Sequence, residues 1–173
     1  MRHISDAEPA STAATQQPAE NVSEHLADLS FAPRLLVWAA RVWWQDAATA
    51  QTSPPGPAHP TNPAHPAHMI GQAFALARCR DAAPAFDELM LMARHGACRH
   101  LDIASHTSRL GRDEQALLGV VAAFQNDAVI GGERALENWL PPATARLAAD
   151  AALKLAREMG RAQLYVERRC PYA

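Results

Sequence analysis

ATARLAADAALKLAREM, residues 143–159, shows the clearest helical pattern in the chain. Apolar side chains recur there at every fourth residue, and charged side chains of alternating sign recur at the same spacing on the neighbouring stripe. The apolar positions are Leu147, Ala151, Leu155 and Met159, and the charged ones are Arg146, Asp150, Lys154 and Glu158. Residues four apart lie on the same side of an α-helix. The stretch therefore predicts an amphipathic helix, ended by Gly160, that buries one face and leaves the other in water.

Helical spacing extends from this stretch back through most of the chain. The other helices that we expect cover residues 22–29, 33–48, 68–80, 84–96, 111–126 and 133–140. Some of their ends are predicted from glycines: Gly96 as a left-handed C-cap, and Gly131 with Gly132 as a break before the last of these helices. Asp113 and Glu114 fall in a first turn, where carboxylates favour the positive end of the helix dipole. The fold class that we expect is all-α, an irregular bundle of about six helices.

Three of the four tryptophans lie in the segment 33–48, at Trp38, Trp43 and Trp44. Apolar residues cover almost the whole circumference of this helix, which is typical of a buried, central one. One alternative is a helix lying in a membrane interface, a site that suits Trp and Arg together. Another follows from size, since three indoles in one short helix are hard to bury completely and aromatic residues are enriched where proteins associate. We therefore expect the three tryptophans to contribute to a homodimer or to a partner surface.

Three segments depart from helical periodicity. Residues 1–20 have no apolar period and predict a flexible N-terminal tail, which leaves 21–173 as a single helical domain. Residues 51–66 contain six prolines and two histidines, which predict a Pro/His-rich surface loop. Its histidines could bind a metal, but a flexible loop has no preset ligand geometry, so a low-complexity insertion is the favoured interpretation. Residues 163–168, QLYVER, alternate as a short C-terminal strand would.

Composition narrows the class of protein. The chain has 173 residues and a net charge of −2, so it has no excess of positive charge to neutralise a nucleic-acid backbone. Lys154 is the only lysine, which we attribute to the codon bias of a GC-rich bacterial genome. Three cysteines without a CxxC pair, and an N-terminus without a signal-peptide pattern, favour the reducing cytoplasm. No apolar run approaches the roughly 20 residues of a membrane-spanning helix.

Side chains of the kind that bind metals are densest in HGACRHLDIASH, residues 95–106. They are His95, Cys98, His100, Asp102 and His106. Imidazole, thiolate and carboxylate groups at these short spacings could surround zinc or another transition metal. Against this, the spacing matches no regular zinc finger, and Arg99 brings a positive charge close to the cation. The alternative is an ordered connection whose polar residues cap the adjacent helices.

No catalytic constellation stands out in the sequence. Asp102, Ser105 and His106 have the residue types of a hydrolytic triad, but such triads assemble from distant segments around a strained nucleophile turn. Residues 133–159 outline a helix–turn–helix whose second helix is nearly neutral, and DNA readers present a basic surface. We therefore expect a helical protein that acts by non-covalent association with itself or with another protein. The alternative is a metal-binding or metal-dependent protein that uses residues 95–106.

Overall fold

The computed structural model describes residues 25–52, 65–103 and 107–167. Its elements are the 3₁₀-helix η1 (Leu26–Asp28) and the α-helices α1 (Phe31–Thr52), α2 (Pro66–Leu76), α3 (Ala82–Gly96), α4 (Arg112–Gln125), α5 (Val129–Glu137) and α6 (Pro142–Arg161). These residues form no β-strand, and the prediction of an all-α bundle with about six helices is confirmed. The predicted tail 1–20 and most of the predicted loop 51–66 lie outside the described residues. None of the helices seen here is both long and apolar enough to cross a membrane.

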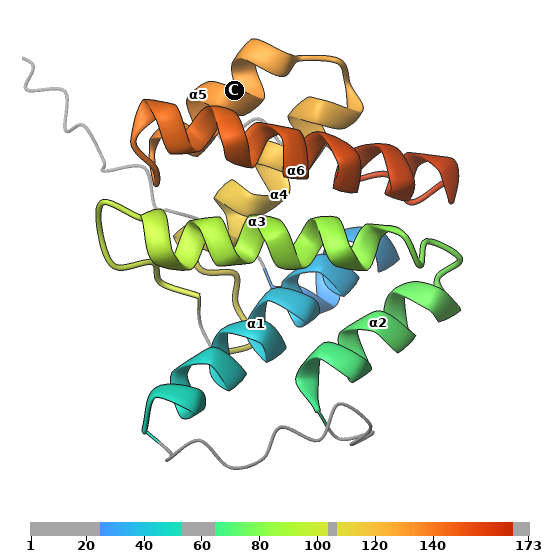
Figure 1. The fold of residues 1–173 in the computed structure, drawn as a ribbon. Coiled ribbons are helices and arrows are strands. Elements are labelled where there is room, and N and C mark those ends of the chain that lie inside the picture. Colours follow the sequence, from blue (N-terminus) through green and yellow to red (C-terminus); the bar gives the residue numbers. More distant parts are fainter. Residues whose placement is uncertain (1–24, 53–64, 104–106, 168–173) are drawn as a thin grey trace, which may run out of the picture.

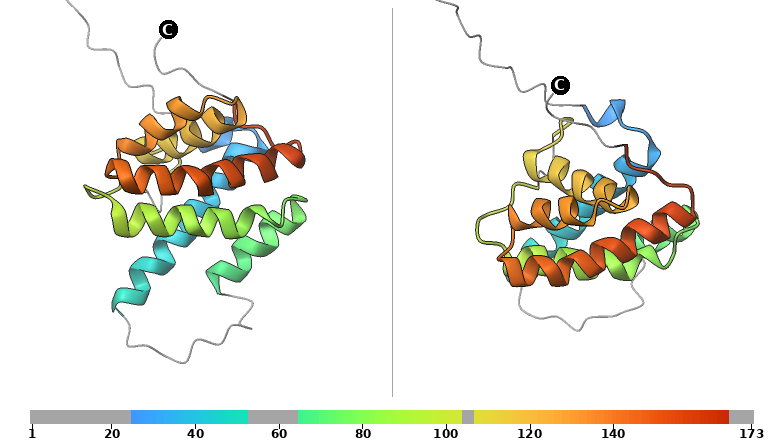
Figure 2. Two further views of the ribbon diagram at one scale, coloured as in Figure 1. Left: turned by 45° about the horizontal axis from the view of Figure 1, so that its top comes forward. Right: turned by 90° about the horizontal axis from the view of Figure 1, so that it is seen from above.

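The bundle is built around the antiparallel pair α3 and α6, which lie side by side along their whole length (Figure 1). Helices α4 and α5 pack against α6 and against each other, as the views from other directions show (Figure 2). Helix α1 crosses behind α3 to reach α4, and α2 lies beside α1 at the periphery. Helices α1 and α2 therefore form one edge of the molecule.

Helix α6 lets α3 approach closely because its buried face is mostly alanine. The fully buried side chains on this face include Ala148, Ala152, Leu155 and Met159. The expected stripe at every fourth residue is only partly right, because Leu147 at its start is 61% exposed. Four residues turn a helix by about 40° more than one full revolution, so a strict four-residue stripe winds away from the contact over several turns. The buried face follows the mixed three- and four-residue spacing instead.

The prediction that glycines end the helices is only partly right. Helix α5 runs through Gly131 and Gly132 without a break, and Gly96 is the last residue of α3 in place of a left-handed cap. Gly132 is required by packing, because a Cβ there would lie 2.6 Å from Cε2 of Phe124 on α4. Gly96 has a similar role, since its Cβ would lie 2.9 Å from Cγ2 of Thr144. Both residues are small because another helix packs directly against them.

Three helix ends are closed by a left-handed residue that is not glycine. These residues are Arg78 after α2, Asp127 after α4 and Gln163 after α6, with φ of 61°, 55° and 58°. At each end the N–H of the next residue donates to the carbonyl five residues before it, as from Cys79 to Phe74 at 2.9 Å. This is the hydrogen-bond pattern of the Schellman motif. These three helices therefore end without glycine, the residue that adopts a left-handed conformation at the least cost.

The predicted strand at 163–168 is wrong for the part that the structure describes, which has no strand up to Glu167. This segment instead pairs with one side chain on α4. Gln125 donates from Nε2 to the carbonyl of Leu164 at 2.8 Å, and its Oε1 accepts from the N–H of Val166 at 2.8 Å. One amide thus satisfies the backbone groups that a partner strand would otherwise satisfy. Of the predicted helix 22–29, the described residues 25–29 form only the single turn η1.

Candidate functional site

Two neighbouring carboxylates, Asp113 and Glu114, are buried at the start of α4 with 1% and 0% exposure. Their position in the first turn is as predicted from the sequence. Each carboxylate is bound by an arginine from a different part of the chain, which the local pattern did not indicate. Arg41 on α1 is 73 positions away from Glu114. The two ion pairs therefore tie distant segments to the N-terminus of α4.

Arg41 binds Glu114 with two parallel hydrogen bonds, from Nε to Oε1 at 2.7 Å and from Nη2 to Oε2 at 2.8 Å. The same guanidinium donates to the carbonyls of Thr107 and Arg109 at 2.7 and 3.0 Å. Glu114 also accepts from the N–H of Gly111 at 2.8 Å, which closes the first turn of α4. Charge-assisted, bidentate hydrogen bonds of this kind are stronger than hydrogen bonds between neutral groups. Arg41 thereby fixes both α1 and the connection before α4.

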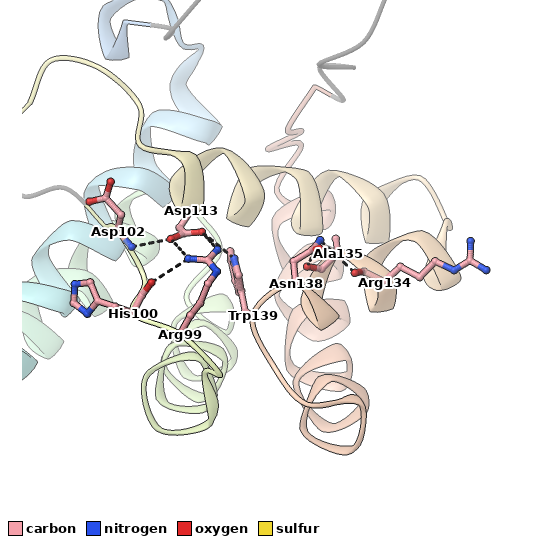
Figure 3. A network of polar contacts seen from close by, with 8 residues as sticks. All are labelled: Arg99, His100, Asp102, Asp113, Arg134, Ala135, Asn138 and Trp139. Atoms are coloured by element: carbon pink, nitrogen blue, oxygen red, sulfur yellow. Dashed lines mark hydrogen bonds and ion pairs between the residues drawn. The ribbon is translucent and has the colours of Figure 1, made fainter. Parts of the chain in front are cut away.

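Asp113 is held by Arg99, which donates to both carboxylate oxygens (Figure 3). The N–H of Asp102 donates to Oδ2 at 2.7 Å, and the indole Nε1 of Trp139 donates to Oδ1 at 3.2 Å. Burial raises the pKa of Asp113, but the hydrogen bonds from Arg99, Asp102 and Trp139 outweigh it and hold the pKa below its ordinary value. The hydrogen bond to Asp113 in turn raises the pKa of Arg99.

This polar network is fully paired. No buried side-chain nitrogen or oxygen lacks a hydrogen-bond partner in the described part of the chain. Both carboxylates are enclosed by the protein. The arrangement holds the described parts of the connection before α4, residues 97–103 and 107–111, against α1, α4 and the loop after α5, where Trp139 lies. The polar network therefore serves to position the backbone before α4.

Of the proposed metal ligands in residues 95–106, His95 is in the last turn of α3, and Cys98, His100 and Asp102 follow along the connection. His95, Cys98, His100 and Asp102 are exposed, while Arg99 between them turns inward to Asp113. The N–H of Cys98 donates to the carbonyl of Trp139 at 2.8 Å. Within 25–52, 65–103 and 107–167, no three His, Cys, Asp or Glu side chains come together as metal ligands. His106 lies outside these residues, so the metal site stays a prediction, which metal analysis of the purified chain and of Cys98→Ser would test.

The three tryptophans of α1 have different surroundings. Trp43 is in the core, where its Nε1 donates to Oδ1 of Asp87 at 2.7 Å. Trp44 is half-buried, with the guanidinium of Arg94 5.5 Å from its ring centroid, a cation–π contact. Trp38 is 39% exposed. Of the three residues expected at an interface, Trp38 is the one that faces outward.

Trp38 separates two hollows on the surface of α1. The first has a volume of about 350 Å³ and is lined by Leu26, Val37 and Val42 among others. The second has a volume of about 450 Å³ and lies between α1 and α2, lined by Phe31, Leu35, Ala73 and Leu76 among others. We call these the η1 hollow and the α2 hollow. Arg34 and Trp38 line both of them.

The side chains around the α2 hollow are unusually exposed for large apolar groups. Phe31 is 54% exposed and Leu76 is 86% exposed. Together with Arg34 and Trp38 they form what we call the Trp38 face. Trp38 was expected at an interface from the sequence, whereas Phe31 and Leu76 were not. Their exposure depends on how α2 lies beside α1, and no local pattern gives that placement.

Comparison with protein-family models, with curated proteins and with solved structures finds no match to this chain.

Proposed function

We propose that the protein acts in the cytoplasm by non-covalent association with another protein or with a second copy of itself, through the Trp38 face. One observation carries the proposal: Phe31, Trp38 and Leu76 lie exposed around a single hollow. A contiguous apolar patch with an aromatic residue beside a hollow is typical of protein-binding surfaces. The free thiols of Cys79 and Cys98 support a reducing compartment.

The buried network gives this face a firm support. Arg41 belongs to the lining of the η1 hollow, and its guanidinium is held by Glu114 and two backbone carbonyls. Trp38 is on the same helix, less than one turn away. A surface mounted on a fixed helix loses little conformational freedom when a partner binds, and this lowers the cost of association.

A photo-crosslinking amino acid at position 76 tests the proposal in cells. We expect a discrete crosslinked adduct, either with a second copy or with another protein. The matched control is the same substitution at Leu147, an apolar residue on α6 that is also exposed and lies outside both hollows. Mass spectrometry of the adduct identifies the occupant. Absence of an adduct at position 76, or equal adducts at both positions, would reject association through this face.

A further inference from the structure

Arg34 and Trp38 together form the wall between the two hollows. They are four residues apart on α1, so their side chains lie on the same side of the helix. Arg34 is exposed, and both residues line the η1 hollow as well as the α2 hollow. The boundary between two apolar hollows therefore carries a cation beside an indole.

The charge of this wall is not balanced locally. Arg34 and Arg41 are the charged residues that line the hollows, and no carboxylate lines either of them. Arg41 is neutralised by Glu114. Arg34 makes no ion pair with any carboxylate in the described ranges. One positive charge therefore remains in the apolar surface, where an incoming carboxylate would be attracted and an incoming cation repelled.

The α2 hollow is an apolar surface between two helices, lined in part by small residues. Its floor includes the small residues Ala73 and Ala77 of the α2 end, and its rim is formed by Phe31 and Leu76. Small residues between two packed helices leave room for side chains of a third. A helix that binds in a hydrophobic groove contacts the groove through apolar residues one or two turns apart. Trp38 lines a hollow on each side, so two apolar positions of one bound helix have a place to enter.

From these observations we propose that the Trp38 face binds an amphipathic helix of another protein, whose apolar residues enter the two hollows and whose flanking Asp or Glu pairs with Arg34. This inference rests on the proposed function and names the class of partner. A second copy is disfavoured by charge. In a two-fold symmetric contact the same patch meets itself, and no carboxylate lines either hollow, so the second copy brings another Arg34 and no acidic partner for it.

Selection from a phage-displayed library of amphipathic helices, with the full chain as the target, tests the inference. The library keeps an apolar stripe constant and randomises the flanking positions. We expect Asp and Glu to be enriched beside the stripe. Arg34→Gln should weaken a selected helix by about tenfold, since it removes one charge-assisted hydrogen-bonded pair. Arg34→Glu should select Lys and Arg in place of Asp and Glu.

Controls separate the Trp38 face from the rest of the surface. Leu76→Ser should abolish binding of the selected helices, and it removes a side chain that is 86% exposed, so folding is preserved. Leu147→Ser and Arg157→Glu, both at exposed positions on α6, should leave binding unchanged. The inference is rejected if selection enriches no acidic residue, or if Arg34→Glu retains the acidic preference. It is also rejected if sedimentation shows a dimer that Leu76→Ser dissociates, because a second copy then covers the face.

The two proposals fail in different ways. A discrete adduct from position 76 together with helices selected without regard to charge would leave the proposed function standing and reject the acidic helix. Loss of both the adduct and the binding of selected helices would reject both. An adduct with another protein, selected helices that are acidic and their loss in Arg34→Glu would support both.

Discussion

At the scale of single residues, the buried carboxylates Asp113 and Glu114 accept hydrogen bonds from α1, from the connection before α4 and from the loop after α5. Glu114 is fully buried and its partner Arg41 is 11% exposed, so neither charge has much access to water. A buried pair gains little over an apolar pair of the same size, but removal of one partner leaves an uncompensated charge. The two effects can be separated by substitution.

Arg41→Met is expected to lower the free energy of unfolding by about 3–5 kcal/mol, because Glu114 is then buried without its cation. The double variant Arg41→Met/Glu114→Met should recover most of that loss. Urea denaturation of the two single variants and the double variant measures the coupling. Additive losses in the double variant would show that the pair does not act as a unit.

Asp113 makes the stability depend on pH. Its pKa in the folded chain lies below its ordinary value of 3.8, so its contribution to stability is present above about pH 4 and is lost as the pH falls further. We expect Asp113→Asn to flatten this acid-side loss. Asp102→Asn, at an exposed carboxylate, is the control and should leave the loss unchanged. Urea denaturation at pH 7 and pH 3 provides the comparison, and equal pH slopes in wild type and Asp113→Asn would contradict it.

At the scale of elements, packing decides what each glycine does. Gly132 on α5 has the Phe124 ring against it, whereas Gly119 on α4 has nothing within 4 Å of an added Cβ. Gly132→Ala should therefore destabilise by about 1–3 kcal/mol through overpacking. Gly119→Ala should stabilise by about 1 kcal/mol, since alanine favours a helix interior. Thermal unfolding of the two variants gives opposite shifts if the contact of α4 with α5 is as described.

The left-handed helix ends provide a second prediction at this scale. Gln163→Gly is expected to raise the free energy of unfolding by about 0.5–1 kcal/mol, because glycine adopts φ near 58° without the steric cost that a side chain has there. Asp127→Gly should gain less, since Asp tolerates this conformation better. Gln163→Ala has a Cβ and should give no gain. Chemical denaturation compares the three, and a gain in the alanine variant would contradict a conformational cause.

At the scale of the whole molecule, α2 is the least supported helix. It has 11 residues and packs chiefly against α1 and α3 at the edge of the bundle (Figure 1). Local opening is easiest where few apolar contacts are lost. We expect amide hydrogen exchange to be fastest in α2 among the α-helices and slowest in the packed centre of α3, α4 and α6. Binding of a selected acidic helix should slow exchange in α2, and uniform protection across all six helices would contradict this picture.

The sequence predicts the periodic parts of the fold well and the long-range contacts poorly. Helix α4 was expected at 111–126 and occurs at Arg112–Gln125, because its apolar spacing and its first-turn carboxylates are local signals. Gly132 was misread because its reason for being small is Phe124 on another helix. For the same reason Trp38 was named as an interface residue without Leu76, which becomes its neighbour across the α2 hollow only after α1 and α2 pack.

The long reach of Arg41 has a consequence for how the chain is made. The ribosome synthesises α1 well before Thr107, Arg109 and Glu114, which bind the guanidinium of Arg41. Until α3 is made, the indoles of α1 have neither α3 nor α4 to cover them, and α4 is still missing after that. The nascent chain therefore exposes this apolar helix until α4 is added. Biosynthesis of this molecule therefore includes an interval in which a cellular chaperone has a clear target, and that interval closes when α4 emerges.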